Sequence, residues 1–303
     1  MASKYGKATL VIVLCFSVLF LPVSTGFSKS SKHLSSHRKH LIVESERVPG
    51  KLVLRSAAVL VEDQLTGECL VRKKAAVALP IASITKLMTA MVVIDANMDL
   101  EESINIEATD VDTLRHSHSR MSVGTQLTRR EALLLALMSS DNRSAHALGR
   151  TYQGGLEACI TAMNAKARSL GLLETRFDDP TGLSSGNVSS ARDLVRLVDT
   201  AYQYYLIREF TTCKETAIQS GGRMLEFRNT NRLIQNPHWQ IGLSKTGFIG
   251  EAGRCLVMQA HLAQRPVLIV LLDSQGTMTR IGDANRIKRW LEARSPSQRA
   301  QKG

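Results

Sequence analysis

The chain has 303 residues, 44% of them hydrophobic and 22% charged, and its formal net charge is +12 at pH 7. This composition is typical of a globular protein with one large domain or two modest ones. It excludes a minimal scaffold that folds only around a metal ion or disulfides, because a chain of this length can bury a sizeable core.

The first 26 residues have the pattern of a secretory signal peptide. Lys4 and Lys7 precede an apolar run over residues 8–23, and the small residues at 24–26 are suited to cleavage near Gly26. The run is short for a bilayer span, which takes about 20 apolar residues. We therefore expect a periplasmic protein, or one secreted to the cell wall, with no stable membrane anchor after cleavage. A retained N-terminal anchor is the alternative.

The segment after the signal peptide, residues 27–50, is predicted to be a disordered basic linker. It contains SKSSKHLSSHRKH, which is rich in Ser, Lys and His and has no apolar periodicity. Loss of Lys4 and Lys7 with the signal peptide leaves a net charge of +10. An exported chain rarely meets nucleic acid, so this charge favours an anionic polymer outside the cytoplasm over DNA or RNA.

Strand patterns open and close the main part of the chain, which we expect at residues 51–293 with a tail at 294–303. Residues 52–71 form two β-rich runs around a turn, a hairpin pattern. The sequence returns to strand patterns at 241–248, 254–262 and 266–273, and a last helix is predicted over 279–293.

A helical region, placed at about residues 85–235, separates these strands. Helices are predicted at 84–96, after the capping box of Thr128 and Glu131, at 156–170 before the stop signal Gly171, and from 190 to about 205. This order predicts an α+β fold. The first hairpin and the C-terminal strands form one antiparallel sheet flanked by helices, the helical region is inserted, and a cleft lies where the two parts meet.

Four cysteines follow the signal peptide: Cys69, Cys159, Cys213 and Cys255. Their even number in an exported chain permits disulfides, and buried unpaired thiols are the alternative. No two of them form a CxxC pair, so a zinc ribbon is not expected. The sequence alone does not choose between thiols and disulfides.

The first candidate for chemistry is the pair Ser83 and Lys86. Three residues apart on a helix, their side chains share a face and can touch. A serine hydroxyl is a weak nucleophile until a base takes its proton, and a lysine can be that base when burial keeps it neutral. Alone the pair is a weak signal, because a lysine snorkelling beside a serine at a helix N-terminus has the same spacing.

Two further motifs follow. Ser140, Asp141 and Asn142 come directly after an apolar helix, and Lys245, Thr246 and Gly247 lie in a predicted strand. Each has an ordinary explanation, as a turn with an N-cap and as a solvated strand edge. Together, in the order S-x-x-K, S-D-N and K-T-G, the three motifs form the set found in class A β-lactamases and penicillin-binding proteins.

Over about residues 51–291 the chain resembles the serine D-alanyl-D-alanine peptidases of low molecular mass, a family of penicillin-binding proteins. The matching blocks are ASITKLMTAMVVID, LLLALMSSDNRSAHAL, FDDPTGLSSGNVSSARDL and KTGFIGEAGRCLV. Carboxypeptidase members typically add a small β domain and an amphipathic anchor, whereas few residues follow Ala293 here. The resemblance is therefore to the D-alanyl-D-alanine endopeptidase branch, of the penicillin-binding protein 7 type.

The resemblance implies a β-lactamase/transpeptidase-like fold and assigns roles to the motif residues. Ser83 is the expected nucleophile, Lys86 its base, and Ser140 a relay that protonates the leaving amine. Asn142, Lys245, Thr246, Gly247 and Phe248 are the expected substrate-binding residues, with the backbone N–H groups of Ser83 and Phe248 as the oxyanion hole. The implied partners are peptidoglycan and β-lactam inhibitors, and neither a metal nor another cofactor is needed.

Several alternatives remain open from the sequence. A carboxypeptidase would remove terminal D-Ala rather than cleave cross-links. A β-lactamase on the same fold would need a carboxylate to activate water, and the block around Asp178 and Asp179 contains no Glu. A non-catalytic murein-binding protein would fit the charge but not the intact motifs. His116 and His118 form an H-x-H pair, but no third zinc ligand at a matching spacing accompanies them.

Overall fold

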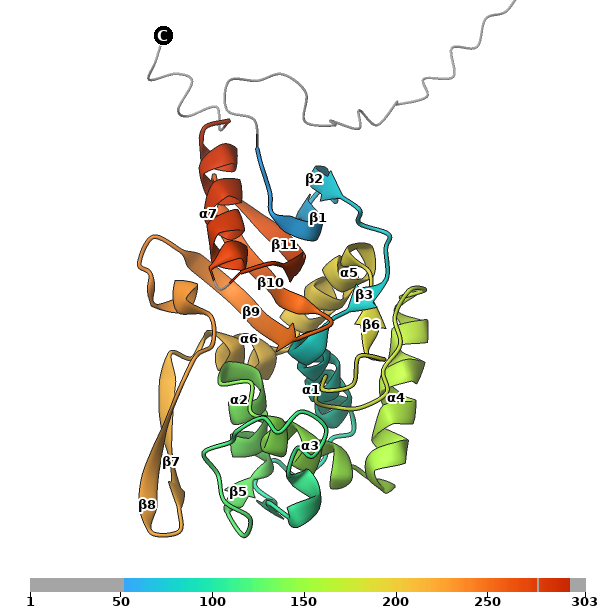
Figure 1. Cartoon of the computed structure of the whole chain (residues 1–303), viewed down its shortest axis with the longest axis vertical. Helices are drawn as coiled ribbons and strands as arrows, with labels where there is room; N and C mark the ends of the chain where they lie inside the picture. The colour runs from blue at the N-terminus through green and yellow to red at the C-terminus, as the bar shows by residue number, and fades with distance from the viewer. Residues whose placement is uncertain (1–51, 277, 295–303) are drawn as a thin grey trace, which may run out of the picture. The chain divides into compact units, whose positions relative to one another are not determined.

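The computed structural model describes residues 52–276 and 278–294. The predicted signal peptide, the whole of the predicted linker and residues 295–303 of the predicted tail lie outside these residues. The centre of the fold is a five-stranded sheet in the order β2-β1-β11-β10-β9 (Figure 1). Its strands are β1 (Ser56–Asp63), β2 (Cys69–Lys73), β9 (Gln240–Ile249), β10 (Gly253–Leu262) and β11 (Arg265–Ser274).

All neighbours in this sheet are antiparallel, and β1 pairs with β11, which joins the first hairpin to the C-terminal strands. The prediction of one antiparallel sheet from both ends of the chain is confirmed. Side chains alternate between two cores, as the period of two in a strand requires. Val59 and Val61 pack with α7 (Thr279–Glu292), whereas Ala58 and Leu60 join the core on the helical side.

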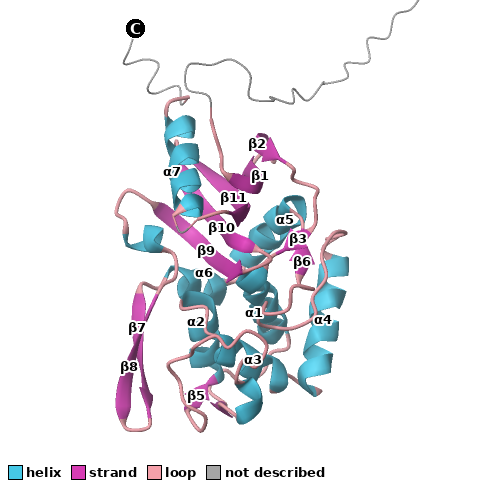
Figure 2. Ribbon diagram, viewed as in Figure 1, coloured by secondary structure: helices cyan, strands magenta, loops and turns pink. Residues whose placement is uncertain are grey.

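Helices cover both faces of the sheet (Figure 2). α7 lies against β10 and β11, and α5 (Ala191–Tyr202) contacts β1, β10 and β11 from the other side. The helical region also contains α1 (Lys86–Asp95), α2 (Arg129–Met138), α3 (Asn142–Arg150), α4 (Gly155–Ser169) and α6 (Tyr205–Thr212). α1 contacts each of the other four and α5, so this helix, which begins at Lys86, is at the centre of the helical core.

The local signals that predicted these helices correspond to caps in the structure. The Thr128 side chain accepts a hydrogen bond from the Glu131 N–H, and the Glu131 carboxylate accepts one from the Thr128 N–H, so the capping box is confirmed. Ser190 caps α5 in the same way through the Asp193 N–H. Each cap satisfies N–H groups that the helix leaves without partners, which is worth about 1 kcal/mol.

Some elements were not predicted. A separate helix α6 follows α5, because Tyr204 adopts an extended conformation and interrupts the helical run. The hairpin of β7 (Glu215–Ser220) and β8 (Arg223–Arg228) turns at Gly221 and Gly222, which have φ of 55° and 77°. Gly-Gly is a hairpin signal, but the flanking polar residues conceal it. Short strand pairs, β3 (Leu79–Pro80) with β6 (Val188–Ser189) and β4 (Ser103–Asn105) with β5 (Gln126–Thr128), complete the fold.

One glycine fixes the backbone in front of Ser83. Gly182 has φ of +83°, and a Cβ atom on it would lie 2.0 Å from the Ala82 carbonyl oxygen. We expect Gly182→Ala to destabilise the protein by about 3 kcal/mol or more, since both the conformation and the contact must give way. Gly124→Ala is the matched control, because Gly124 has φ of +88° with nothing within 4 Å. Urea unfolding of the two variants measures the difference, and equal losses would contradict the role of the contact.

Candidate active site

Ser83 lies in the 3₁₀ helix η1 (Ala82–Thr85), and Lys86 is the first residue of α1 directly after it. The Lys86 Nζ lies 2.8 Å from the Ser83 Oγ, within hydrogen-bond distance, so the predicted contact across one helical face is present. Ala82, just before the serine, has φ of 48°, a left-handed conformation that is uncommon for a residue with a side chain. The Lys86 residue is only 1% exposed, whereas Ser83 is partly exposed.

Lys86 has two further polar neighbours, and both present a carbonyl oxygen. Its Nζ donates to the Asn142 Oδ1 at 2.8 Å and to the Thr181 backbone oxygen at 2.6 Å. Burial lowers the pKa of Lys86 to about 7, against the opposing effect of the carboxylates of Asp179, Asp141 and Asp112. A lysine in this environment can exchange a proton with Ser83 near neutral pH.

Ser140 lies in the tight connection between α2 and α3, in a left-handed conformation with φ of 62°. Asp141 follows as the N-cap of α3, and its carboxylate accepts from the Ser144 N–H. The turn and N-cap interpretation of the S-D-N motif is therefore also correct. The Ser140 Oγ accepts a hydrogen bond from the Lys245 Nζ at 2.8 Å. The structure thus places Ser140 against Lys245, while Lys86 takes its partners from other segments.

The strand β9 contributes the K-T-G motif beside η1. Lys245 is 1% exposed, and its Nζ also donates to the Thr246 backbone oxygen at 3.0 Å. Burial, followed by the nearby charges of Lys86 and Arg280, holds the pKa of Lys245 well below its usual value. Two buried ammonium groups repel each other, so protonation of one lysine disfavours protonation of the other.

Gly247 and Phe248 complete the strand. A Cβ on Gly247 would lie 2.7 Å from the Ile81 backbone oxygen and 3.2 Å from the Ser83 backbone nitrogen, so only glycine lets β9 pack this closely on η1. The next side chain, Phe248, is 55% exposed, and the Arg254 guanidinium lies 4.5 Å from the centre of its ring. The structure therefore brings together all three motifs at the junction of the sheet and the helical region.

Some groups at the site were not predicted as site residues. Thr181 acts through its backbone oxygen, which leaves no trace in the side-chain pattern. Thr230 contacts Thr246 with 2.6 Å between the hydroxyl oxygens, although Thr230 lies outside every motif. Arg280 donates to the backbone oxygens of Gly247 and Cys255 at 2.9 and 3.0 Å, which ties α7 to β9 and β10.

The loop after α4 holds Thr181 in place through Asp179. The Asp179 carboxylate accepts from the N–H groups of Thr181, Gly182 and Ser184 and from the Asn187 side-chain amide. A carboxylate with both oxygens engaged in this way organises the loop and is poorly suited to activating a water molecule. This arrangement counts against the β-lactamase alternative, which needs a carboxylate free to activate water.

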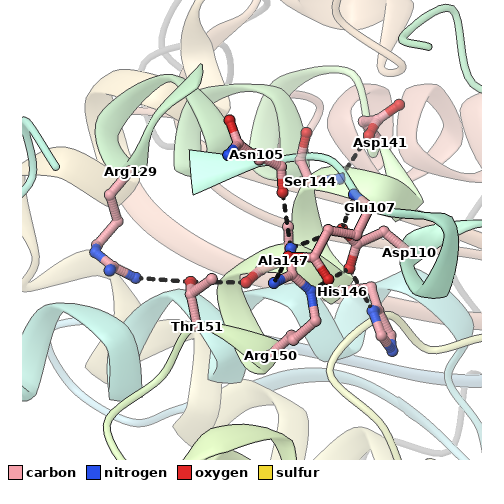
Figure 3. A network of polar contacts seen from close by, with 10 residues as sticks. All are labelled: Asn105, Glu107, Asp110, Arg129, Asp141, Ser144, His146, Ala147, Arg150 and Thr151. Atoms are coloured by element: carbon pink, nitrogen blue, oxygen red, sulfur yellow. Dashed lines mark hydrogen bonds and ion pairs between the residues drawn. The ribbon is translucent and has the colours of Figure 1, made fainter. Parts of the chain in front are cut away.

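A second polar network fastens α3 to the 3₁₀ helix η2 (Ala108–Asp110) (Figure 3). The Asp110 carboxylate lies 2.7 Å from the His146 Nδ1 and accepts from the Arg150 guanidinium at 2.9 and 3.1 Å. Burial alone would raise the pKa of Asp110, but hydrogen bonds from His146, Arg150 and the Glu107 N–H outweigh it and lower the pKa. The network fixes η2 against the helix that begins with Asn142.

The sequence also raised the questions of a metal site, of disulfides and of a membrane-spanning segment. Within residues 52–276 and 278–294, no group of three or more His, Cys, Asp or Glu is placed to hold a metal ion. The thiols of Cys69, Cys159, Cys213 and Cys255 are all unpaired, so the disulfide interpretation is wrong for these four. None of the helices in the described part of the chain is long and apolar enough to cross a membrane.

An antiparallel sheet with an inserted helical region, and a serine and a buried lysine at their junction, defines the class of active-site serine hydrolases to which penicillin-binding proteins belong. The family described as D-alanyl-D-alanine carboxypeptidase, peptidase S11, matches residues 45–276. This range is most of the chain. The protein therefore belongs to this family of serine-type D-Ala-D-Ala peptidases, and the predicted family membership is confirmed.

Individual proteins that resemble this chain have names that fit the same family. A D-alanyl-D-alanine endopeptidase of Pseudomonas aeruginosa is 48% identical over 81% of this chain and 80% of its own length. One of Escherichia coli K12 is 42% identical over 79% and 78%. The crystal structure of the Streptomyces K15 DD-transpeptidase matches with a TM-score of 0.73 and 27% identity, over 80% of this chain and 98% of that one. The predicted transpeptidase-like α+β fold is confirmed.

Proposed function

We propose that the protein is an exported, penicillin-sensitive DD-endopeptidase that cleaves D-Ala-containing cross-links in peptidoglycan through an acyl-enzyme. The contact that carries the proposal is the 2.8 Å approach of a buried lysine, with its pKa lowered to about 7, to the Ser83 hydroxyl. The names of the relatives from Pseudomonas aeruginosa and Escherichia coli support the endopeptidase assignment. No resident cofactor is part of the proposal.

In the acylation step, Lys86 takes the Ser83 proton while the Ser83 Oγ attacks the carbonyl carbon of D-alanine. The backbone N–H groups of Ser83 and Phe248 stabilise the oxyanion, which can lower the barrier by several kcal/mol. The C–N bond then breaks, and the proton that Lys86 took passes through Ser140 to the leaving amine; the Ser140 hydroxyl lies 2.8 Å from the Lys245 Nζ. Water hydrolyses the resulting ester and restores the free serine.

The remaining motif residues bind the substrate in this proposal. Asn142 holds the peptide group of the stem, and Lys245 attracts a substrate carboxylate that hydrogen-bonds Thr246. The arriving negative charge would raise the lowered pKa of Lys245 and so favour its charged form. Gly247 leaves room beside β9, and Phe248 presents its N–H to the oxyanion. A β-lactam, which mimics the D-Ala–D-Ala end, acylates Ser83 by the same route.

The same proposal covers the organisation of the chain. Residues 1–26 are a signal peptide, 27–50 a basic linker, 51–293 the catalytic domain with its helical insertion at about 85–235, and 294–303 a tail. The mature protein acts in the periplasm or at the cell wall without a stable membrane anchor. Its net charge of +10 after signal cleavage suits an anionic wall polymer.

Digestion of purified cross-linked muropeptide dimers tests the endopeptidase assignment. We expect monomers as the product, because cleavage of the cross-link separates the two stems. Release of terminal D-Ala alone, with the dimer intact, would instead identify a carboxypeptidase. A parallel digestion with Ser83→Ala controls for contaminating hydrolases, since no product should form there.

A further inference from the structure

The three neighbours of Lys86 determine where its lone pair points. A protonated lysine has three N–H donors, and a neutral one has two donors and one lone pair. The oxygens of Thr181 and Asn142 can only accept, and they lie 2.6 and 2.8 Å from Nζ. In the neutral amine they take both donors, so the lone pair is left for the Ser83 hydroxyl at 2.8 Å. This is the arrangement that a general base needs.

The arrangement depends on which end of the Asn142 amide faces the lysine. If the amide were turned over, its NH₂ group would donate to the Lys86 lone pair and compete with the Ser83 proton. The structure has the oxygen toward Lys86 and the nitrogen toward Ser117, with 2.7 Å between Nδ2 and the Ser117 Oγ. Something must therefore make Ser117 an acceptor, since a hydroxyl can also donate.

Asp112 holds Ser117 in position for this contact. Its carboxylate accepts from the N–H groups of Leu114, Arg115 and Ser117, each at 2.9 Å, and it is largely buried. Burial alone would raise the pKa of Asp112, but a hydrogen bond from the Ser117 side chain, together with these N–H groups, lowers it. The Ser117 N–H bond to this carboxylate holds the residue in place, and the Ser117 Oγ accepts from the Asn142 amide.

We propose that Ser117, which Asp112 holds through the Ser117 N–H, is a positioning residue that keeps the Asn142 oxygen toward Lys86. The inference rests on the proposed function, in which Lys86 is the base. Asn142 then donates to Ser117 and accepts from Lys86, so each of these two contacts has one donor and one acceptor. The second N–H of the Asn142 amide stays available for a substrate carbonyl.

The position of Asp112 is itself secured. It lies two residues after Asp110, which the network of His146 and Arg150 binds to α3, and α3 begins with Asn142 (Figure 3). α3 therefore anchors the base of the loop that carries Ser117, and Ser117 in turn contacts Asn142 at the start of α3. Asp112 and Asn142 are thus both held at α3, which fixes their separation.

The test compares acylation by a fluorescent penicillin in the full chain and in Ser117→Ala between pH 5.5 and 9. We expect a loss of roughly 10- to 100-fold in the plateau rate, part of what a general base contributes. The acidic limb of the profile, where the acylation rate falls with falling pH, should also move to lower pH. The reason is that a turned amide no longer offers Lys86 an oxygen that stabilises its charged form. The other charges around Lys86, those of Asp179, Asp141, Asp112 and Lys245, are unchanged in this variant.

Two further variants distinguish positioning from packing. Ser117→Thr keeps the hydroxyl and should retain the rate within a few-fold. Ser119→Ala is the matched control, because the Ser119 hydroxyl lies in the same loop but donates to Asp141, at 2.7 Å, and not to Asn142. It should leave the pH limb in place and the rate within about threefold.

Asp112→Asn should also move the acidic limb to lower pH, since the neutral amide weakens the contact that holds Ser117 and removes a charge that raises the pKa of Lys86. A wild-type rate in Ser117→Ala, or an equal loss in Ser119→Ala, would overturn the inference. So would a lower plateau with an unmoved pH limb, the result expected of a structural defect alone. A wild-type protein that the penicillin does not acylate would instead overturn the proposed function, so the two failures are distinguishable.

Discussion

Replacement of Ser83 by alanine is expected to abolish the covalent adduct with penicillin and to lower peptide hydrolysis by roughly 10⁴-fold or more, as loss of an attacking serine does in other serine peptidases. The Ser83 hydroxyl is the group that the lone pair of the neutral Lys86 can face, at 2.8 Å. The measurement is intact-protein mass spectrometry after incubation with a penicillin, followed by peptide mapping.

The control for this variant is Ser122→Ala, which removes a hydroxyl from an exposed position outside the site. It should form the adduct at the wild-type rate. Because alanine is small and Ser83 is partly exposed, the fold should survive the change, and circular dichroism checks this. An adduct on Ser83→Ala, or a wild-type adduct mapped to a peptide without Ser83, would refute the nucleophile assignment.

The pH dependence of acylation should follow the Lys86 pKa. We expect an acidic limb with a midpoint near pH 7, below which the rate falls about tenfold per pH unit, because only the neutral amine can take the Ser83 proton. Lys86→Met should lower the plateau by roughly 10²- to 10⁴-fold and remove the limb. Lys288→Met, which removes an ion pair with Glu292 on α7 and a contact with the Trp239 ring, is the matched control and should change neither.

The same lysine should leave a signature in stability. Its pKa falls from 10.5 to about 7 on folding, so between these values the unfolded state binds more protons than the folded state. Stability therefore rises with pH across this window, and the penalty is fully present below pH 7. A shift of this size corresponds to at most about 5 kcal/mol. The free energy of unfolding of the wild type relative to Lys86→Met should rise from pH 7 to 10, and a flat difference would contradict a buried neutral lysine.

Much of the fold could be predicted because its signals are local. The capping box at Thr128 and the stop at Gly171 depend on a few consecutive residues, and the apolar runs at 254–262 and 266–273 are long enough to identify as strands. The contact of Ser83 with Lys86 follows from helical spacing alone. That the three motifs would meet was predicted from their joint occurrence, not from any one of them.

The parts that escaped prediction depend on contacts between distant segments. The Thr181 oxygen that accepts from Lys86 belongs to the main chain, 95 residues away in sequence. Ser117 reaches Asn142 across 25 residues, from a loop whose His, Ser and Arg content is ordinary for a surface. Ser140 was predicted as the relay to the leaving amine, and its hydrogen bond to Lys245 was not predicted. Such details are set by packing rather than by composition.

The backbone at Ala82 and Ser140 bears on how this protein could be engineered. Both residues have side chains yet adopt left-handed conformations, with φ of 48° and 62°, beside the proposed nucleophile and at the proposed proton relay. Each such residue costs of order 1 kcal/mol, which the rest of the fold must offset. Substitutions that relieve the strain at these two positions would therefore raise the stability of the fold. They would also disturb the proposed nucleophile or the proposed proton relay and so lower the activity. Substitutions on the far face of the sheet, under α7, carry no such conflict.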